Sequence, residues 1–92
     1  MVIYIKDVVN ACDTNAQGDV IFRLASARVA SGQTVTLDFS GILNVTSSFT
    51  NSALVELADR YGIDAVRKLV VLRSVNRQIS NMVKSRLSRQ LA

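Results

Sequence analysis

The sequence predicts a single small α/β domain over residues 1–92, with a mostly parallel or mixed sheet of about three or four strands and about three helices. Apolar, β-branched segments alternate along the chain with segments whose apolar residues recur at helical spacing. The length of 92 residues allows one hydrophobic core. Alternation of this kind favours parallel strands joined by right-handed crossovers, with the helices packed on the sheet.

The first strand and the first helix are predicted within the first third of the chain. Residues 2–9 are rich in Val and Ile, which favours a strand, and the Asn, Asp, Thr and Gly content of residues 10–18 favours a loop. Apolar residues at helical spacing predict a helix over residues 20–30, with Asp19 as its cap. Ser31-Gly32 then supplies a stop signal.

A second strand and a second helix follow, and the change between them falls on three hydroxyl residues. Residues 34–39 alternate apolar and polar side chains, as a strand does, and Ser40-Gly41 begins a turn. From residue 47 to residue 61 the apolar residues return at helical spacing, and Gly62 stands where a left-handed residue ends a helix. The switch in period falls at Thr46-Ser47-Ser48.

The last third of the chain predicts one more strand and one more helix. The continuous apolar run from Leu69 to Leu72 is typical of a central strand that is covered on both faces. After it, the spacing of apolar residues predicts an amphipathic helix. The apolar residues expected to pack inward are Val75, Ile79, Met82, Val83 and Leu87.

Charge is concentrated toward the C-terminal end. The chain carries 11 Lys and Arg against 7 Asp and Glu, and no acidic residue follows Asp64. The predicted basic face consists of Arg77, Lys84, Arg86 and Arg89. A cationic block of this kind could be the solvated face of a helix, or it could bind an acidic protein or nucleic acid.

The composition argues against an enzyme. The chain contains no His, which is the commonest catalytic base and the commonest nitrogen ligand of zinc, and its isolated glycines form no phosphate-binding loop. The single Cys12 has no neighbour in sequence that would activate a thiol, so we expect a small, semi-buried residue at a strand end. We therefore expect no catalytic residues, no cofactor and no metal.

The chain also lacks the sequence features of a membrane or secreted protein. No apolar run approaches the ~18 residues that span a bilayer, and the first residues carry no basic leader. A lone Cys fits a reducing compartment. The expected location is the cytoplasm, without membrane contact.

One segment resembles a known family. The run LDFSGILNVTSSFTNSAL, residues 37–54, resembles the signature region of STAS domains, the sulfate transporter and anti-sigma factor antagonist superfamily. In that region a strand ending Asp-aliphatic-Ser-Gly leads to an Asp-Ser-Ser or Asp-Ser-Thr helix start. More closely, LDFSGI at residues 37–42 followed by Ser48-Phe49 resembles the family of STAS-like domains of unknown function. The likeness is specific over residues 37–57.

The resemblance implies a regulatory, non-enzymatic module. In anti-sigma factor antagonists the serine after the Asp at the helix start is phosphorylated by a kinase of the histidine-kinase-like ATPase type, and Ser47 is the matching residue. Thr46 stands in place of that Asp, and Phe49 and Thr50 replace the usual glycine and leucine. The resemblance also places Asp38 and Ser40 on the same surface.

Two hypotheses for function result. The first is a protein-binding module that docks on a histidine-kinase-like ATPase or similar partner through residues 40–52, with Ser47 as a candidate phosphorylation site. Its candidate partner-binding residues are Asp38, Ser40, Thr46, Ser47, Ser48, Asn51, Ser52 and Val55. The second is a small nucleic-acid-binding protein that uses the basic face.

Simpler roles stay open for the same residues. One hydroxyl of the Thr46-Ser47-Ser48 cluster could do no more than cap the helix, or the cluster could dock on a partner without modification. Asp38 could fix the loop by accepting hydrogen bonds from backbone N–H groups. Val55, Leu91 and Cys12 could also mark a contact in a homo-oligomer.

Overall fold

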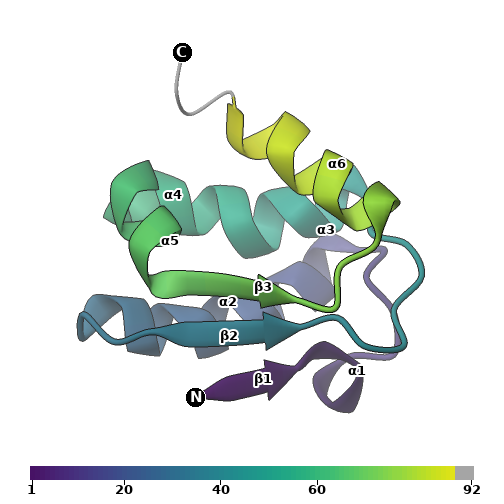
Figure 1. The fold of residues 1–92 in the computed structure, drawn as a ribbon, viewed down its shortest axis with the longest axis horizontal. Coiled ribbons are helices and arrows are strands. Elements are labelled where there is room, and N and C mark those ends of the chain that lie inside the picture. Colours follow the sequence, from purple (N-terminus) through teal and green to yellow (C-terminus); the bar gives the residue numbers. More distant parts are fainter. Residues whose placement is uncertain (89–92) are drawn as a thin grey trace.

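Three short strands form a parallel sheet in the computed structural model, which describes residues 1–88. Strand β1 (Val2–Tyr4) pairs with β2 (Val35–Asp38), and β2 pairs with β3 (Val70–Arg73), so β2 lies in the middle. The carboxyl ends of all three strands point toward one edge of the sheet, here called the carboxyl edge (Figure 1). The predicted α/β class with parallel strands is confirmed.

Helices connect successive strands and cover one face of this sheet. Helix α2 (Asn15–Ala30) connects β1 to β2. Between β2 and β3 runs one continuous helical segment made of α3 (Ser47–Thr50), the π-helix η1 (Asn51–Val55) and α4 (Glu56–Tyr61). Both connections pass behind the sheet in Figure 1, which is the right-handed arrangement expected of parallel units.

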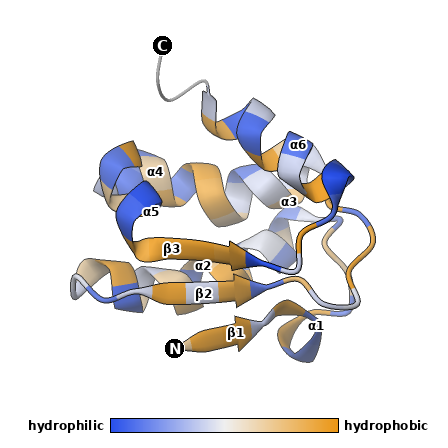
Figure 2. Ribbon diagram, in the orientation of Figure 1, coloured by the Kyte–Doolittle hydropathy of each residue, from blue (hydrophilic) through white to orange (hydrophobic). Residues whose placement is uncertain are grey.

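Side chains alternate between the two faces of the sheet. Ile3 and Leu37 point toward the helices and are buried, whereas Tyr4 and Val71 lie on the opposite face and are exposed. In Figure 2 the strands are mostly coloured as apolar, in keeping with the inward half of this alternation. The core therefore sits between the sheet and its covering helices.

The first strand is shorter than predicted. It ends at Tyr4, and the chain continues into the short helix α1 (Ile5–Val8). Ile5 and Val9 are buried in the core. The apolar, β-branched residues that suggested a strand to residue 9 therefore reflect burial and not continued strand pairing.

Helix α2 begins earlier than predicted, at Asn15, and Asp19 is not its cap. Thr14 Oγ1 accepts a hydrogen bond from the Gln17 N–H at 3.2 Å, and Gln17 Oε1 accepts from the Thr14 N–H at 3.1 Å. This reciprocal pair is a capping box, which the T-x-x-Q spacing encodes. Gly18, taken for a loop residue, lies in the first turns of the helix and is buried.

The third strand lies at an edge of the sheet and not at its centre. The apolar run does form a strand, but Val71 is 44% exposed because no strand pairs beyond β3 in the described residues. An additional helix, α5 (Ile63–Leu69), precedes it and was not predicted. Gly62 does end α4 as expected, with a φ of 93°, and α5 starts directly after it.

The final helix, α6 (Arg77–Leu87), packs as its spacing predicts. Ile79 and Val83 are buried, and Met82 and Leu87 pack against the core. Val75 precedes the helix and is exposed, so its predicted inward position is wrong. Over residues 1–88, no helix combines the length and apolar character needed to cross a bilayer.

Candidate functional site

The predicted site residues lie around the carboxyl edge of the sheet. The loop of residues 39–46 leaves β2 at this edge and leads to the start of α3. Residues 74–76, which follow β3, and residues 9–14, which precede α2, lie at the same edge. Ligands of parallel α/β sheets bind outside the carboxyl ends of the strands, so this edge is the place to look for function.

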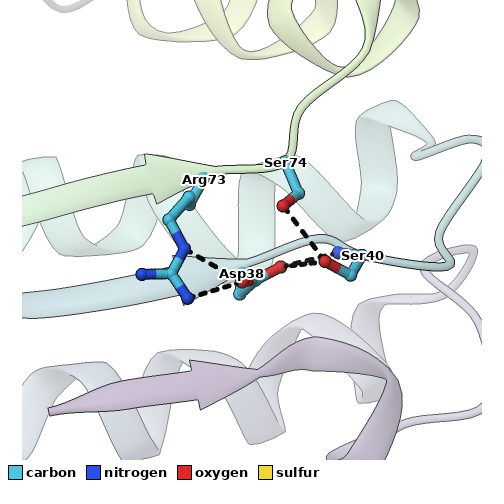
Figure 3. Close-up of polar contacts among 4 residues, drawn as sticks. All are labelled: Asp38, Ser40, Arg73 and Ser74. Carbon is cyan, nitrogen blue, oxygen red and sulfur yellow. Dashed lines mark hydrogen bonds and ion pairs between the residues drawn. The ribbon is translucent and has the colours of Figure 1, made fainter.

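Asp38 anchors the loop at its base (Figure 3). Its Oδ1 accepts hydrogen bonds from the Ser40 N–H at 2.8 Å and from the Ser40 hydroxyl at 2.6 Å. Its Oδ2 lies 3.0 Å from both Nε and Nη2 of Arg73. The hydroxyl oxygens of Ser40 and Ser74 lie 3.0 Å apart.

This environment decides what Asp38 can do. The two hydrogen bonds from Ser40 are the main reason that the pKa of Asp38 falls from 3.8 to about 2, and Arg73 lowers it further. Asp38 is only 3% exposed. A carboxylate that is buried and so weakly basic is a poor proton acceptor, and the geometry favours the loop-fixing role over direct contact with a partner.

The start of α6 holds the far part of the loop. The Gln78 side-chain amide pairs with the backbone of Val45: its Oε1 accepts from the Val45 N–H and its Nε2 donates to the Val45 carbonyl, each at 2.9 Å. Asn76 Nδ2 donates to the Leu43 carbonyl at 2.8 Å. The loop is therefore fixed by contacts distant in sequence, which composition alone did not predict.

Thr46 is the N-terminal cap of α3. Its Oγ1 accepts a hydrogen bond from the Phe49 N–H at 3.2 Å and donates to the Asp13 carbonyl at 2.8 Å. Its backbone N–H donates to the Cys12 carbonyl at 3.0 Å. Of the three clustered hydroxyl residues, Thr46 is the one that performs the capping role.

Ser47 and Ser48 are the first two residues of α3, as predicted. Ser47 is half-buried and Ser48 is exposed. Within the described chain, neither side chain makes a hydrogen bond to another protein group. Both hydroxyls therefore lie near a helix N-terminus, where the macrodipole favours negative charge.

The other predicted contact residues belong to the π-helix. Asn51 is exposed, and Ser52 and Val55 are half-buried. Ser52 Oγ donates to Asn15 Oδ1 at 3.0 Å, which joins this segment to the start of α2. Single π turns inside α-helices occur frequently at functional sites, and the sequence pattern gave no indication of this one.

The predicted basic residues do not gather on one surface. Arg77 and Lys84 are exposed and lie about two turns apart along α6. Arg86 is half-buried, and its Nε is buried without a hydrogen-bond partner in the described part of the chain. Arg89 lies outside the described residues. Arg73, which sequence reasoning missed, is the cation that pairs with Asp38; the register of β2 and β3 places the two residues opposite each other.

The described residues offer little to a metal or to thiol chemistry. No group of three His, Cys, Asp or Glu side chains in residues 1–88 is arranged to hold a metal ion. Cys12 is 1% exposed, and burial, with a smaller contribution from Asp13, raises the pKa of its thiol to about 12. The expectation that Cys12 marks a surface for self-association is therefore wrong, and Leu91 lies outside the described residues.

Comparison with known proteins gives one match. A family model described as a STAS-like domain of unknown function (DUF4325) matches residues 17–79. The matched region extends from α2 to the first turn of α6 and includes the loop and the helix start described above. No curated protein and no solved structure matches the chain.

Proposed function

The chain belongs to the family of STAS-like domains of unknown function, and from this premise we propose that it is a regulatory module that binds another protein. The proposed contact surface is formed by residues 40–52, and Ser47 is the proposed switch. The proposed partner is a histidine-kinase-like ATPase or a regulator of similar kind, in keeping with the resemblance to anti-sigma factor antagonists. Catalysis by this chain is not part of the proposal.

The observation that carries the proposal is the division of roles within the hydroxyl cluster. Thr46 caps α3, so the helix does not need Ser47 or Ser48 for that purpose. Ser48 is exposed, Ser47 is half-buried, and no described side chain occupies their hydroxyls. Hydroxyls that the fold does not use are available to a partner or to a kinase.

The rigid loop supports the same proposal. Contacts from Asp38, Asn76 and Gln78 fix the loop before any partner arrives. A surface that is already ordered loses less conformational entropy on binding than a flexible one. The loop therefore has the properties of a preformed docking element.

Phosphorylation of Ser47 would act on binding more than on folding. A phosphate adds about −1.5 to −2 charges at neutral pH. At the start of α3 the helix tolerates this charge, because the free N–H groups and the macrodipole favour anions. A partner surface that fits a neutral hydroxyl would be disrupted by the same charge, and the complex would dissociate.

A capture experiment with matched variants tests this function. The tagged chain is expressed in its native cells, and partners of the wild type and of Ser47→Ala, Ser47→Asp and Ser31→Asp are quantified by mass spectrometry. Ser31 is exposed at the end of α2, so Ser31→Asp makes the same chemical change far along the chain from the proposed surface. We expect Ser47→Asp to reduce capture of one specific partner by about tenfold or more.

The controls separate binding from folding. Ser31→Asp should retain the partner, and the thermal unfolding midpoint of Ser47→Asp should stay close to that of the wild type, since Asp is favourable in the first turn of a helix. The same samples are searched for a phosphopeptide that contains Ser47. Equal capture by Ser47→Asp and the wild type would reject the switch.

A further inference from the structure

A second surface feature lies away from the loop, between α5 and the C-terminal half of α6. It is a groove of about 310 Å³. The residues that line it, called here the α5–α6 groove, are Ile63, Arg67, Val83, Lys84, Leu87 and Ser88. The proposed surface at residues 40–52 contacts the opposite end of α6, through Asn76 and Gln78. The groove therefore has no part in the function proposed above.

The floor of the groove is apolar and continuous with the core. Val83 is buried, and Ile63 and Leu87 are half-buried and pack against the core cluster. Most of the surface that these residues leave open is carbon. Open apolar surface set in a polar rim is typical of an interaction site.

The rim of the groove carries positive charge without an internal counter-charge. Arg67 and Lys84 are both exposed. The ion pair seen among the described residues joins Arg73 to Asp38 and involves neither of them. Because no acidic residue follows Asp64 in the sequence, the positive potential over this groove is not offset locally.

From this combination we propose that the α5–α6 groove binds an acidic amphipathic peptide segment of a partner protein. An apolar side chain of the peptide would occupy the floor formed by Val83 and Leu87, and flanking carboxylates would pair with Arg67 and Lys84. Amphipathic helices bind apolar grooves in this way, with charge complementarity setting specificity. Nucleic acid fits less well, because no aromatic residue lines the groove to stack a base, and an apolar floor is of no use to phosphates.

A designed peptide pair tests the proposal. The probe is a synthetic peptide with leucine at every third or fourth position and glutamate elsewhere, and its counterpart carries glutamine in place of glutamate. Binding to the full 92-residue chain is followed by ¹⁵N chemical shifts. We expect the glutamate peptide to shift the amides of Ile63, Val83 and Leu87, and the glutamine peptide to bind about tenfold more weakly or worse.

Matched variants locate the contact. Arg67→Glu combined with Lys84→Glu should weaken binding of the glutamate peptide by about tenfold or more, since two ion pairs become repulsive. Lys68→Glu combined with Arg77→Glu makes the same change in net charge at exposed positions outside the groove and should alter affinity by less than about twofold. Leu87→Gln should also weaken binding, with its circular dichroism spectrum checked for folding.

Three results would overturn the proposal. The first is an equal loss of affinity in the two charge-reversal pairs, which would mean binding by net charge alone. The second is displacement of the peptide by a short single-stranded oligonucleotide whose affinity survives Leu87→Gln, which would assign the cations to nucleic acid. The third is peptide binding that occurs only after residues 89–92 are deleted, which would make the chain's own end the occupant of the groove.

Discussion

The two long helical segments of this domain begin in different ways, although each begins with a threonine cap. At the start of α2, Thr14 and Gln17 bond to each other, and the cap is closed within four residues of the chain. At the start of α3, Phe49 stands where Gln17 stands in α2, and its side chain enters the core. Thr46 instead bonds to the backbone of Cys12 and Asp13.

The difference explains why only one of the two helix starts is a candidate site. A cap closed by local side chains uses its own polar groups. A cap that is held by a neighbouring loop leaves the next residues, Ser47 and Ser48, without a structural task in the described chain. Tertiary anchoring therefore fixes the α3 start in place and leaves its hydroxyls available.

The largest expected effect comes from exchanging the residues at the third helical position. Phe49→Ala should reduce the free energy of unfolding by about 3–5 kcal/mol, because it empties a fully buried site. Gln17→Ala removes only hydrogen bonds near the surface and should reduce it by about 0.5–1.5 kcal/mol. Urea denaturation of both variants measures the two values, and similar losses would contradict the difference between the two helix starts.

Gly18 joins the two helix starts and gives the next largest effect. A Cβ at this position would lie 2.6 Å from the Phe49 carbonyl oxygen and 2.7 Å from Ser52 Cβ. Gly18→Ala should therefore reduce the free energy of unfolding by about 1–3 kcal/mol, even though alanine favours a helix by about 1 kcal/mol over glycine. Asp19→Ala, at the adjacent exposed position, is the control and should change stability by less than about 0.5 kcal/mol. A stabilised Gly18→Ala variant would show that α2 and η1 can separate freely.

The two caps should differ in strength. Thr14→Ala should cost about 1 kcal/mol, the usual value for losing a cap. Thr46→Ala should cost about 2 kcal/mol, since the same hydroxyl also donates to the Asp13 carbonyl at 2.8 Å. Thr46→Ser keeps both hydrogen bonds and should recover most of the loss. Equal costs for the two alanine variants would mean that the long-range bond adds nothing to the cap.

The smallest effect is absent at neutral pH and appears only in acid. The pKa of Asp38 is about 2 in the fold, below its ordinary value of 3.8, chiefly because Ser40 donates two hydrogen bonds. Its contribution to stability is therefore complete above about pH 4 and is lost as the pH falls toward 2. Urea midpoints measured between about pH 2 and pH 5 should show this loss, and Asp38→Asn should flatten the slope. A variant with the wild-type slope would contradict the role given to Asp38.

Much of the fold was predictable from local patterns. The period change at residues 46–48 located the start of α3, and Gly62 located the end of α4, because caps and left-handed residues act within a few residues of the chain. The STAS-like resemblance, confirmed by the family match, rested on the same segment. The order of strands and helices followed from alternation alone.

The wrong predictions share a physical cause. Gly18 suggested a loop, but the residue is small because two helices approach each other there. Leu69–Leu72 suggested a central strand, but its apolar residues pack against helices while β3 stays at the edge. For the candidate site, the sequence located Asp38 and Ser47, whereas Gln78 and Arg73 act through contacts that only the tertiary structure creates.

The π-helix fixes the length of the segment that carries Asn51 and Ser52. A π turn holds one residue more than an α turn, so it sets the rotational phase of everything that follows. Deleting one residue between Asn51 and Val55 would restore a regular helix and rotate the downstream residues by about 100°. Leu57 and Ala58 would then leave the core, so variation at this surface is confined to substitution.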